Sequence, residues 1–180
     1  DPFISMEYIE GEDLTHKVKQ KEGERFSWQE IEPYILSLCE GLAYAHDQGM
    51  VHRDIKPQNL MITKENELKL ADFGIAAPLQ EKDEESDIQV PRAGTPIYWS
   101  PQQATGLPPE PTDDIYSLGV MLYQMLVGEP PFVGGSEPEI TQQHWTKSPV
   151  DPQQALEQKG GKTPLPGYLS KLILKCLAKD

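Results

Sequence analysis

A long run of apolar residues near the start of the chain follows the period of an α-helix. Steps of three or four residues separate most of its members, which are Ile31, Tyr34, Ile35, Leu38, Leu42 and Ala45. This spacing places them on one face and predicts a long amphipathic helix. Ser27 and Glu30 form the pattern of a capping box in front of it, and Gly49 is expected to end it.

A second helical run, from residue 113 to about residue 127, is apolar on nearly every side. A helix without a polar face is usually buried, so this segment predicts a helix at the centre of the core. Thr112 is its expected cap, and residues 128–131, Gly-Glu-Pro-Pro, are expected to terminate it. Three shorter helices are also predicted: from a cap at Asp13 to about Gln20, over residues 137–146, and over residues 166–179, the last two separated by a Pro/Gly-rich loop.

Strand patterns are few and short. Residues 3–9 are rich in β-formers, and the Glu-Gly pair that follows is expected to end that strand. Residues 60–62 and 67–70 predict two further strands, joined as a hairpin by residues 64–66. Residues 75–111 contain prolines at seven positions and are expected to be mostly loop. The pattern as a whole predicts an α+β fold that is mainly α.

Composition is that of a soluble globular domain of 180 residues, with 37% hydrophobic and 25% charged residues. No apolar run approaches the roughly 20 residues of a membrane-spanning helix. The net charge of −13 disfavours nucleic acid or an anionic membrane as a partner. Cys39 and Cys176 are expected to be buried free thiols in a reducing, cytoplasmic compartment. The chain begins without Met or a basic leader, as the interior of a longer protein would.

Candidate chemistry is concentrated in two neighbouring segments. Residues 52–59 read HRDIKPQN, and residues 72–74 read DFG, with a strand pattern between them. Together they supply two carboxylates, a lysine and an amide at fixed offsets. A phosphoryl-transfer site uses these groups to orient a hydroxyl, to neutralise the moving phosphoryl group and to hold magnesium.

These segments, with three others in the same order, resemble a protein kinase. Residues 6–9 are similar to the hinge between its two lobes, residues 94–101 to its peptide-binding loop, and residues 114–119 to its buried central helix. The resemblance covers essentially the whole chain. It implies a protein-kinase-like fold, represented by the helical C-terminal lobe with short β-hairpins at the active site.

The resemblance also implies a domain organisation. Residues 1–180 are expected to form a single, partial kinase domain that is truncated at its C-terminus. The expected parts are the hinge at 1–11, the catalytic and magnesium loops at 50–74, the activation and peptide-binding segment at 75–103, and a helical subdomain at 104–180.

Four residues are implied to carry the reaction. Asp54 is expected to act as the catalytic base toward the substrate hydroxyl, and Lys56 to contact the transferring phosphate. Asn59 and Asp72 are expected to bind Mg²⁺ through oxygen atoms. The lysine two residues after Asp54 is the pattern of Ser/Thr kinases, and Thr95 in a Gly-Thr-Pro sequence agrees with it. The expected partners are therefore ATP, Mg²⁺ and proteins with Ser or Thr acceptors, and the wording of the motifs is bacterial in style.

Six residues are implied to surround the nucleotide. Glu7 and Ile9 would bind adenine through their backbone groups, and Asp13 would reach the ribose. Leu14, Met61 and Ala71 would line the adenine pocket, a role that ordinary core residues can also fill.

The remaining implied roles are structural and regulatory. His52 and Phe73 are expected to pack in a column anchored by Asp114, whose carboxylate would bond the backbone of the catalytic loop. Arg53 is interpreted either as an anchor for a phosphate on the activation segment or as a partner of nearby acids. Ser86, within the acidic run at residues 81–87, is the candidate phosphorylation site.

The chain departs from the family pattern in three respects. The glycine-rich loop, the ATP-gripping lysine and its glutamate partner belong to an N-terminal lobe that this sequence does not contain. Gln102 stands where the family usually has a glutamate, and the chain ends early. We therefore expect a fragment, inactive by itself, of a Ser/Thr kinase that a later helix could tether to a membrane. The alternatives are a pseudokinase or scaffold, and a kinase-like phosphotransferase acting on small molecules.

Overall fold

The computed structural model describes residues 7–72, 77–78 and 94–179. Its helices are α1 (Leu14–Lys19), α2 (Trp28–Asp47), α3 (Pro101–Thr105), α4 (Pro111–Val127), α5 (Glu137–Thr146), α6 (Pro152–Gln158) and α7 (Gly167–Cys176). Its strands are β1 (Gly11–Asp13), β2 (Met50–Val51), β3 (Leu60–Thr63), β4 (Leu68–Leu70) and β5 (Ala77–Pro78). Short 3₁₀ helices occupy Glu22–Glu24, Pro57–Asn59 and Pro96–Tyr98. The predicted class, α+β and mainly α, is confirmed.

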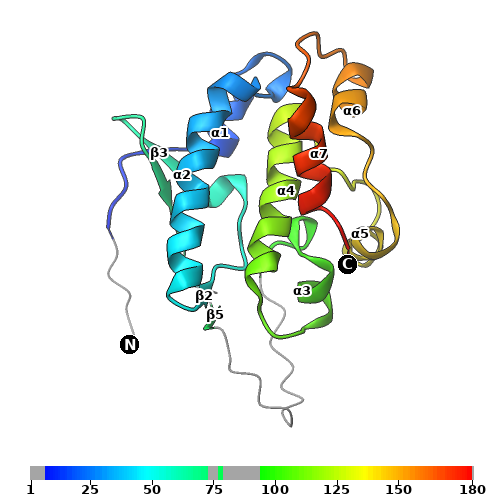
Figure 1. Ribbon diagram of the computed structural model, residues 1–180. Coiled ribbons are helices and arrows are strands. Elements are labelled where there is room, and N and C mark those ends of the chain that lie inside the picture. The colour runs from blue at the N-terminus through cyan, green and yellow to red at the C-terminus, as the bar shows by residue number, and fades with distance from the viewer. Residues whose placement is uncertain (1–6, 73–76, 79–93, 180) are drawn as a thin grey trace.

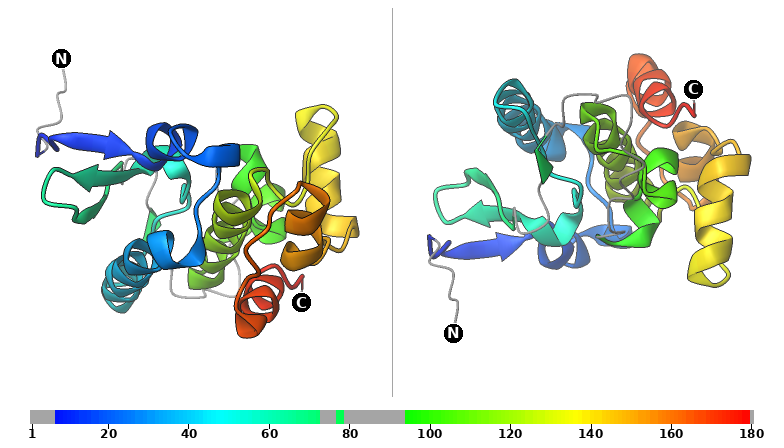
Figure 2. Two further views of the ribbon diagram at one scale, coloured as in Figure 1. Left: turned by 90° about the horizontal axis from the view of Figure 1, so that it is seen from above. Right: turned by 90° about the horizontal axis from the view of Figure 1, so that it is seen from below.

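Helices α2, α4 and α7 form the body of the molecule (Figure 1). Seen from above and from below, the β1–β3–β4 sheet lies at one edge and α5 at the opposite edge (Figure 2). Helix α4 contacts α2, α6 and α7, so it sits between these layers. Among the described residues, no helix is long and apolar enough to cross a membrane.

Helix α2 follows the predicted pattern closely. Both halves of the Ser27–Glu30 capping box are present, with the Glu30 carboxylate 2.8 Å from the Ser27 backbone nitrogen. Burial of the Ile31, Leu38 and Leu42 side chains fixes one face of the helix against the core. Gly49, two residues past the end of the helix, has a φ of +72°, a conformation that glycine adopts without strain.

Helix α4 is the buried central helix that its pattern predicts, but it begins two residues earlier. Its cap is Glu110 and not Thr112, and Asp113 completes a capping box by accepting a bond from the Glu110 backbone nitrogen. The physical reason is Pro111, whose fixed φ and missing N–H suit the first position of a helix. Gly128, with a φ of +94°, ends the helix as predicted.

Only residues 7–9 of the strand expected at residues 3–9 lie within the described residues, and this part is not a strand. Residues 7–10 form no strand, and the first strand is β1, which the Glu-Gly pair helps to begin. Gly11 pairs with Thr63, and a Cβ at Gly11 would lie 2.2 Å from the Ile62 carbonyl oxygen. Pairing with β3 therefore depends on glycine at this position. The β3–β4 hairpin is present as predicted.

Several local expectations were wrong. The Pro/Gly-rich loop contains α6, capped by the Asp151 carboxylate. The segment at 75–111, expected to be mostly loop, is described only at 77–78 and 94–111, where it contains the five-residue α3. Helix α7 ends at Cys176, short of residue 179. Both cysteines are free thiols, but Cys39 is exposed and Cys176 is only half-buried, because each lies at the margin of its helix's apolar face.

Helix α5 is attached to α4 through a fully buried histidine. The Nδ1 atom of His144 lies 2.9 Å from the Tyr116 hydroxyl, and the Phe132 ring packs edge-on against the imidazole. Burial, together with the nearby Lys179 ammonium, lowers the pKa of His144 from its usual 6.5 to about 4. The histidine is therefore neutral in the folded protein at neutral pH.

This buried histidine predicts a loss of stability in acid. Since the pKa is lower in the folded than in the unfolded chain, the unfolded chain takes up the proton first as the pH falls below 6.5. The free energy of unfolding should fall between pH 6.5 and pH 4, by on the order of 3 kcal/mol from this group. Urea denaturation of the parent and of His144→Asn across this range should give a shallower dependence in the variant. Equal pH dependence in the two proteins would contradict the prediction.

Candidate active site

The loop that carries residues 52–59 is held by a buried carboxylate from α4. Asp114 has no exposed surface, and its Oδ1 atom accepts a hydrogen bond of 2.7 Å from the Arg53 backbone nitrogen. Its Oδ2 atom accepts one of 2.9 Å from the His52 backbone nitrogen and lies 2.7 Å from Nε2 of His46. The expected contact between Asp114 and the loop backbone is thus present. His46, at the end of α2, was not foreseen.

Arg53 takes up an unusual backbone conformation in this loop, with a φ of +68°. A non-glycine residue in the left-handed region is strained by about 1–3 kcal/mol unless its surroundings hold it. The Asp114 carboxylate holds its N–H, and the Gln103 side-chain amide donates to its C=O at 2.8 Å. The strain is therefore supported from α4 and α3 together.

Asp54 lies at the centre of a small polar cluster. Its Oδ2 atom is 2.6 Å from the Lys56 ammonium and 3.1 Å from the Asn59 amide nitrogen. Its Oδ1 atom accepts a hydrogen bond of 3.1 Å from the Thr95 backbone nitrogen. Asp54 is only 7% exposed, and both of its carboxylate oxygens have partners within the protein. The sequence places three of these residues, Asp54, Lys56 and Asn59, within six positions, and the fold brings the fourth from residue 95.

Lys56 bridges two parts of the cluster. Its ammonium donates to the Thr95 hydroxyl at 2.8 Å while it is paired with Asp54. The segment that carries Thr95 is fixed to α4, because Ser117 donates to the Tyr98 carbonyl oxygen at 2.7 Å and Ser100 donates to Asp113. Burial raises the pKa of Asp113, against the lowering effect of its hydrogen bonds from Glu110 and Ser100.

Gly94 allows the two loops to approach each other. Its φ is +105°, and a Cβ there would lie 3.0 Å from the Arg53 carbonyl oxygen and 3.2 Å from the Asp54 Oδ1 atom. It would also lie 2.9 Å from Nε1 of Trp99. Only glycine satisfies both the backbone conformation and this spacing.

We expect Gly94→Ala to lower the free energy of unfolding by about 1–3 kcal/mol, because the alanine would be strained and would push Thr95 away from Asp54. Gly41→Ala is a matched control, since nothing lies within 4 Å of a Cβ at this exposed helical position. The control should be more stable than the parent by about 0.5–1 kcal/mol. Urea denaturation measures both, and a Gly94→Ala variant as stable as the parent would contradict the expectation.

Asn59 and Asp72 can supply oxygen atoms to a hard cation. The Asn59 amide nitrogen donates to the Asp54 carbonyl oxygen at 2.8 Å and to its side chain, so the amide oxygen points elsewhere. The Ala71 backbone nitrogen donates to the Asn59 carbonyl oxygen at 2.8 Å, which places exposed Asp72 next to this pair. The described residues contain no cluster of three or more His, Cys, Asp or Glu side chains suited to a metal. The Asn59–Asp72 pair fits Mg²⁺, which commonly takes few protein ligands and completes its shell with water and phosphate.

His52 packs beneath the loop. Its Nε2 atom lies 3.2 Å from the Ala71 carbonyl oxygen, and its Nδ1 atom accepts a hydrogen bond of 3.2 Å from the Asp54 backbone nitrogen. Burial lowers the pKa of His52, although the neighbouring Asp114 carboxylate opposes this. These contacts suit a packing residue. Phe73, the other expected member of its column, lies outside the described residues.

The residues expected around a nucleotide lie on and beside the sheet. Asp13 pairs with Met61 across β1 and β3, and its carboxylate caps α1 by accepting from the His16 backbone nitrogen at 2.9 Å. Met61 and Ala71 are half-buried, whereas Leu14 is fully buried in the core. The two positions expected to use backbone groups are Glu7, which is exposed and pairs with Lys69, and Ile9, which is half-buried.

The regulatory candidates are only partly placed. The Nε and Nη2 atoms of Arg53 are buried, and neither has a hydrogen-bond partner among the described residues. The guanidinium forms no ion pair within 4 Å among the described residues, although its charge acts on the nearby Asp113 carboxylate and opposes the rise of the Asp113 pKa. Ser86 lies outside the described residues. Gln102 is half-buried on α3, where its carbonyl oxygen accepts from the Thr105 hydroxyl.

The family described as protein kinase domain matches residues 2–180. The serine/threonine-protein kinase PknB of Mycolicibacterium smegmatis is 38% identical over 179 residues, which are 99% of this chain and 27% of that protein. PknB of Mycobacterium tuberculosis is 37% identical with the same coverage, and a probable PknB of Bifidobacterium longum is 36% identical over 99% of this chain and 25% of its own length. The chain thus spans about a quarter of the length of these curated relatives.

Proposed function

The chain belongs to the protein kinase family, and from this premise we propose that the complete protein transfers the γ-phosphate of ATP to serine and threonine hydroxyls of other proteins. The family generally uses ATP and Mg²⁺. The observation that carries the proposal is the position of the Lys56 ammonium, 2.6 Å from the Asp54 carboxylate and 2.8 Å from the Thr95 hydroxyl. The names of the bacterial relatives, serine/threonine-protein kinases, support the same acceptor class.

In the proposed reaction, the substrate hydroxyl oxygen attacks the γ-phosphorus while the bond from that phosphorus to the bridging oxygen of ADP breaks. Asp54 orients the hydroxyl and accepts its proton, and Lys56 offsets negative charge on the moving phosphoryl group. Positioning is the larger part of such catalysis, because the transition state is loose. The hydrogen bonds from Asn59 and Thr95 to Asp54 support this role by fixing the carboxylate.

Asn59 and Asp72 are proposed to hold Mg²⁺ at the site. When bound, the ion would neutralise phosphate charge and help to align the nucleotide. The protein's contribution is a pair of oxygen donors on adjacent backbone segments, linked by the bond from Ala71 to Asn59. Thr95 is proposed to hold the peptide-binding loop in position next to the catalytic loop, through the hydrogen bond that its hydroxyl accepts from Lys56.

The nucleotide is proposed to lie against the sheet. Met61 and Ala71 would meet the adenine ring, as would Leu14 if its side chain became accessible in the complete site. Glu7 and Ile9 would contribute backbone groups, and Asp13 would reach the ribose. The half-buried state of Met61 and Ala71 supports this face of the sheet as the floor of the site.

Arg53 and Ser86 are proposed as the two halves of a regulatory contact. Among the described residues, the buried Nε and Nη2 atoms of Arg53 have no hydrogen-bond partner, which supports a phosphate as their acceptor. Phosphorylated Ser86 is the candidate donor of that phosphate. We expect Ser86→Ala to lower the activity of the complete protein, and unchanged activity would remove this role.

Residues 1–180 alone are proposed to transfer phosphate very slowly or not at all. The sequence contains no glycine-rich loop and no lysine from an N-terminal lobe to grip the α- and β-phosphates. The proposed partner in the parent protein is such a lobe. Appreciable turnover by purified 1–180 would contradict this part of the proposal.

The test of the function is phosphate transfer by the complete protein. It is incubated with ATP, Mg²⁺ and a generic acceptor protein, and mass spectrometry locates the phosphate. Phosphoserine or phosphothreonine that forms only when Mg²⁺ is present is the expected product. No phosphate on either protein would favour a pseudokinase that acts as a scaffold, and phosphate found only on small molecules would favour a phosphotransferase.

A further inference from the structure

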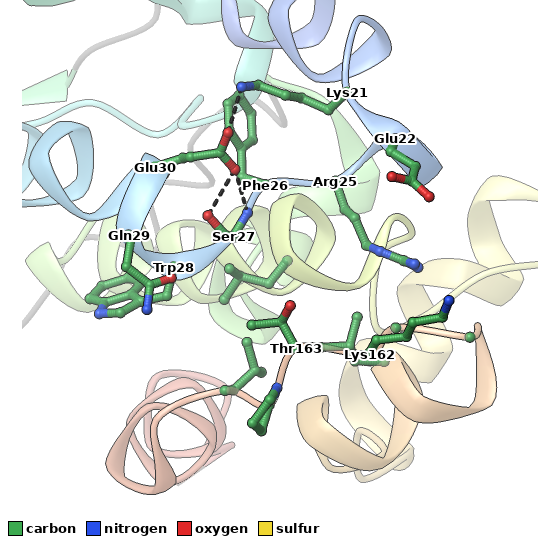
Figure 3. Close-up of a pocket in the computed structure, with 16 residues that line it drawn as sticks. Lys21, Glu22, Arg25, Phe26, Ser27, Trp28, Gln29, Glu30, Lys162 and Thr163 are labelled. Carbon is green, nitrogen blue, oxygen red and sulfur yellow. Dashed lines mark hydrogen bonds and ion pairs between the residues drawn. The ribbon is translucent and has the colours of Figure 1, made fainter.

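A cavity of about 470 Å³ lies at the end of the molecule where α2 begins. It is enclosed by the residues that lead into α2, by the last turn of α4 and by the turn between α6 and α7 (Figure 3). Its volume is within the usual range for small-molecule sites, about 300–1,000 Å³. None of the residues that line the cavity belongs to the catalytic loop at 52–59, and neither Asp72 nor Thr95 is among them. The cavity is thus separate from the proposed phosphoryl-transfer site.

The mouth of this cavity carries two cations that have no anionic partner among the described residues. Arg25 makes one hydrogen bond, from Nη1 to the Lys159 carbonyl oxygen at 3.3 Å, and forms no ion pair there. The exposed Lys162 forms none either. Both side chains extend to the same side of the cavity in Figure 3. In a chain with a net charge of −13, two unpaired cations at one cavity are a local reversal of charge.

The other charged groups of the cavity are mostly engaged with each other. Lys21 pairs with Glu30 at 2.6 Å, and Glu30 also accepts from the Ser27 backbone nitrogen and hydroxyl. The N-terminus of α2 is therefore capped by the Glu30 carboxylate, and it is not proposed as the anion-binding group. Glu22 is the one further carboxylate in the lining, and it is exposed. Arg25 and Lys162 are left to face a ligand.

The inner wall of the cavity is apolar. Phe26, Trp28, Leu126 and Leu156 line it, and all four are buried. The turn from α6 packs directly on this wall, because a Cβ at Gly161 would lie 2.3 Å from the Leu156 side chain. A ligand that fits must therefore carry an anion at one end and a compact apolar body at the other.

We propose that this cavity binds a small organic acid, with one phosphate or carboxylate group on an apolar ring or short chain. The anion lies between Arg25 and Lys162, which hold it by charge-assisted hydrogen bonds. The apolar body lies against Trp28 and Leu156, where its surface is removed from water. The site does not depend on phosphoryl transfer at Asp54.

The test uses the complete protein labelled with 5-fluorotryptophan and ¹⁹F NMR. Trp28 lines the cavity, whereas Trp99 lies beside Gly94 and the catalytic loop, so each site has its own reporter. The chain has three tryptophans, so Trp28→Phe and Trp99→Phe identify the two reporter signals, and the third belongs to Trp145. Phenyl phosphate and benzoate are the probes, with inorganic phosphate and benzyl alcohol to separate the anion from the apolar body. We expect phenyl phosphate to shift the Trp28 signal saturably, with a Kd on the order of 1 mM for a ligand of this size.

Matched variants test whether Arg25 and Lys162 bind the anion. Arg25→Gln and Lys162→Gln should each raise the Kd by about tenfold, because each removes one charge-assisted hydrogen bond. Lys171→Gln, at an exposed position on α7 away from the cavity, should leave it unchanged. If benzoate binds more tightly than phenyl phosphate, the preferred anion is a carboxylate. If phenyl phosphate binds more tightly, the preferred anion is a phosphate. Both results support the site.

Three outcomes would overturn the proposal. One is no saturable shift of the Trp28 signal with either probe. The second is equal affinity in the parent and in both cavity variants. The third is binding of inorganic phosphate as tight as that of phenyl phosphate, which would show that the apolar wall contributes nothing. A shift of the Trp99 signal alone would assign the probe to the catalytic site, and would leave the proposed kinase activity unaffected.

Discussion

Replacing Asp54 with Asn is expected to slow phosphate transfer by the complete protein by about 10²–10⁴-fold, the range for loss of a general base. Asparagine keeps the shape of the side chain, and its oxygen can still accept from the Thr95 backbone nitrogen, which Asp54 does at 3.1 Å. It cannot accept a proton from the substrate hydroxyl. It also cannot form the 2.6 Å ion pair that orients Lys56. The loss should appear in kcat much more than in KM for ATP.

The control for this variant is Asp47→Asn, an exposed carboxylate at the end of α2. Its activity and stability should match those of the parent, within about 0.5 kcal/mol for a surface change. Initial rates at saturating Mg·ATP measure the effect, and circular dichroism checks that both variants are folded. A folded Asp54→Asn protein with more than a tenth of the parental kcat would show that Asp54 is not the base.

The composition of the site could be predicted from sequence because it is largely local. Asp54, Lys56 and Asn59 lie within six residues of one loop, and their spacing alone brings them together. Thr95 comes from a distant segment, and it was expected only through the resemblance to a family. The same is true of Asp114, whose carboxylate reaches back more than sixty positions to the loop.

Residues that support the site from other helices left no local signal. His46 reaches Asp114 from the end of α2, and Gln103 supports the Arg53 carbonyl group from α3. Nothing in their neighbouring sequence distinguishes either residue from a surface polar side chain. Their roles depend on how helices pack, which spacing along one helix does not encode.

The errors in the predicted elements have a related cause. The strand expected at residues 3–9 was inferred from β-formers, but residues 7–9, the part that the structure describes, form no strand, and β3 pairs with residues 11–13 instead. Thr112 is a good cap in isolation, yet Pro111 lets the helix begin earlier at Glu110. In both cases the local sequence allowed two positions for the boundary of the element, and another part of the chain determined which one formed.

Replacing Asp114 with Ala is expected to lower the free energy of unfolding by about 2–6 kcal/mol, because each buried N–H group left without an acceptor costs about 1–3 kcal/mol. Two such groups, the backbone N–H of His52 and of Arg53, now donate to its carboxylate at 2.9 and 2.7 Å. Asp114 itself has no exposed surface, so these two N–H groups are not placed to bond to solvent instead. His46 would lose its partner at 2.7 Å as well.

Activity should fall with stability in this variant, in contrast to Asp54→Asn. Without Asp114, the strained φ of +68° at Arg53 is no longer held from α4, so the loop that carries Asp54 and Lys56 can relax. Urea denaturation gives the first effect, and initial rates at a temperature where the variant is folded give the second. Asp47→Ala serves again as the exposed carboxylate control. A variant with parental stability would mean that the loop does not depend on Asp114. Lost activity with parental stability would instead give Asp114 a direct part in the chemistry.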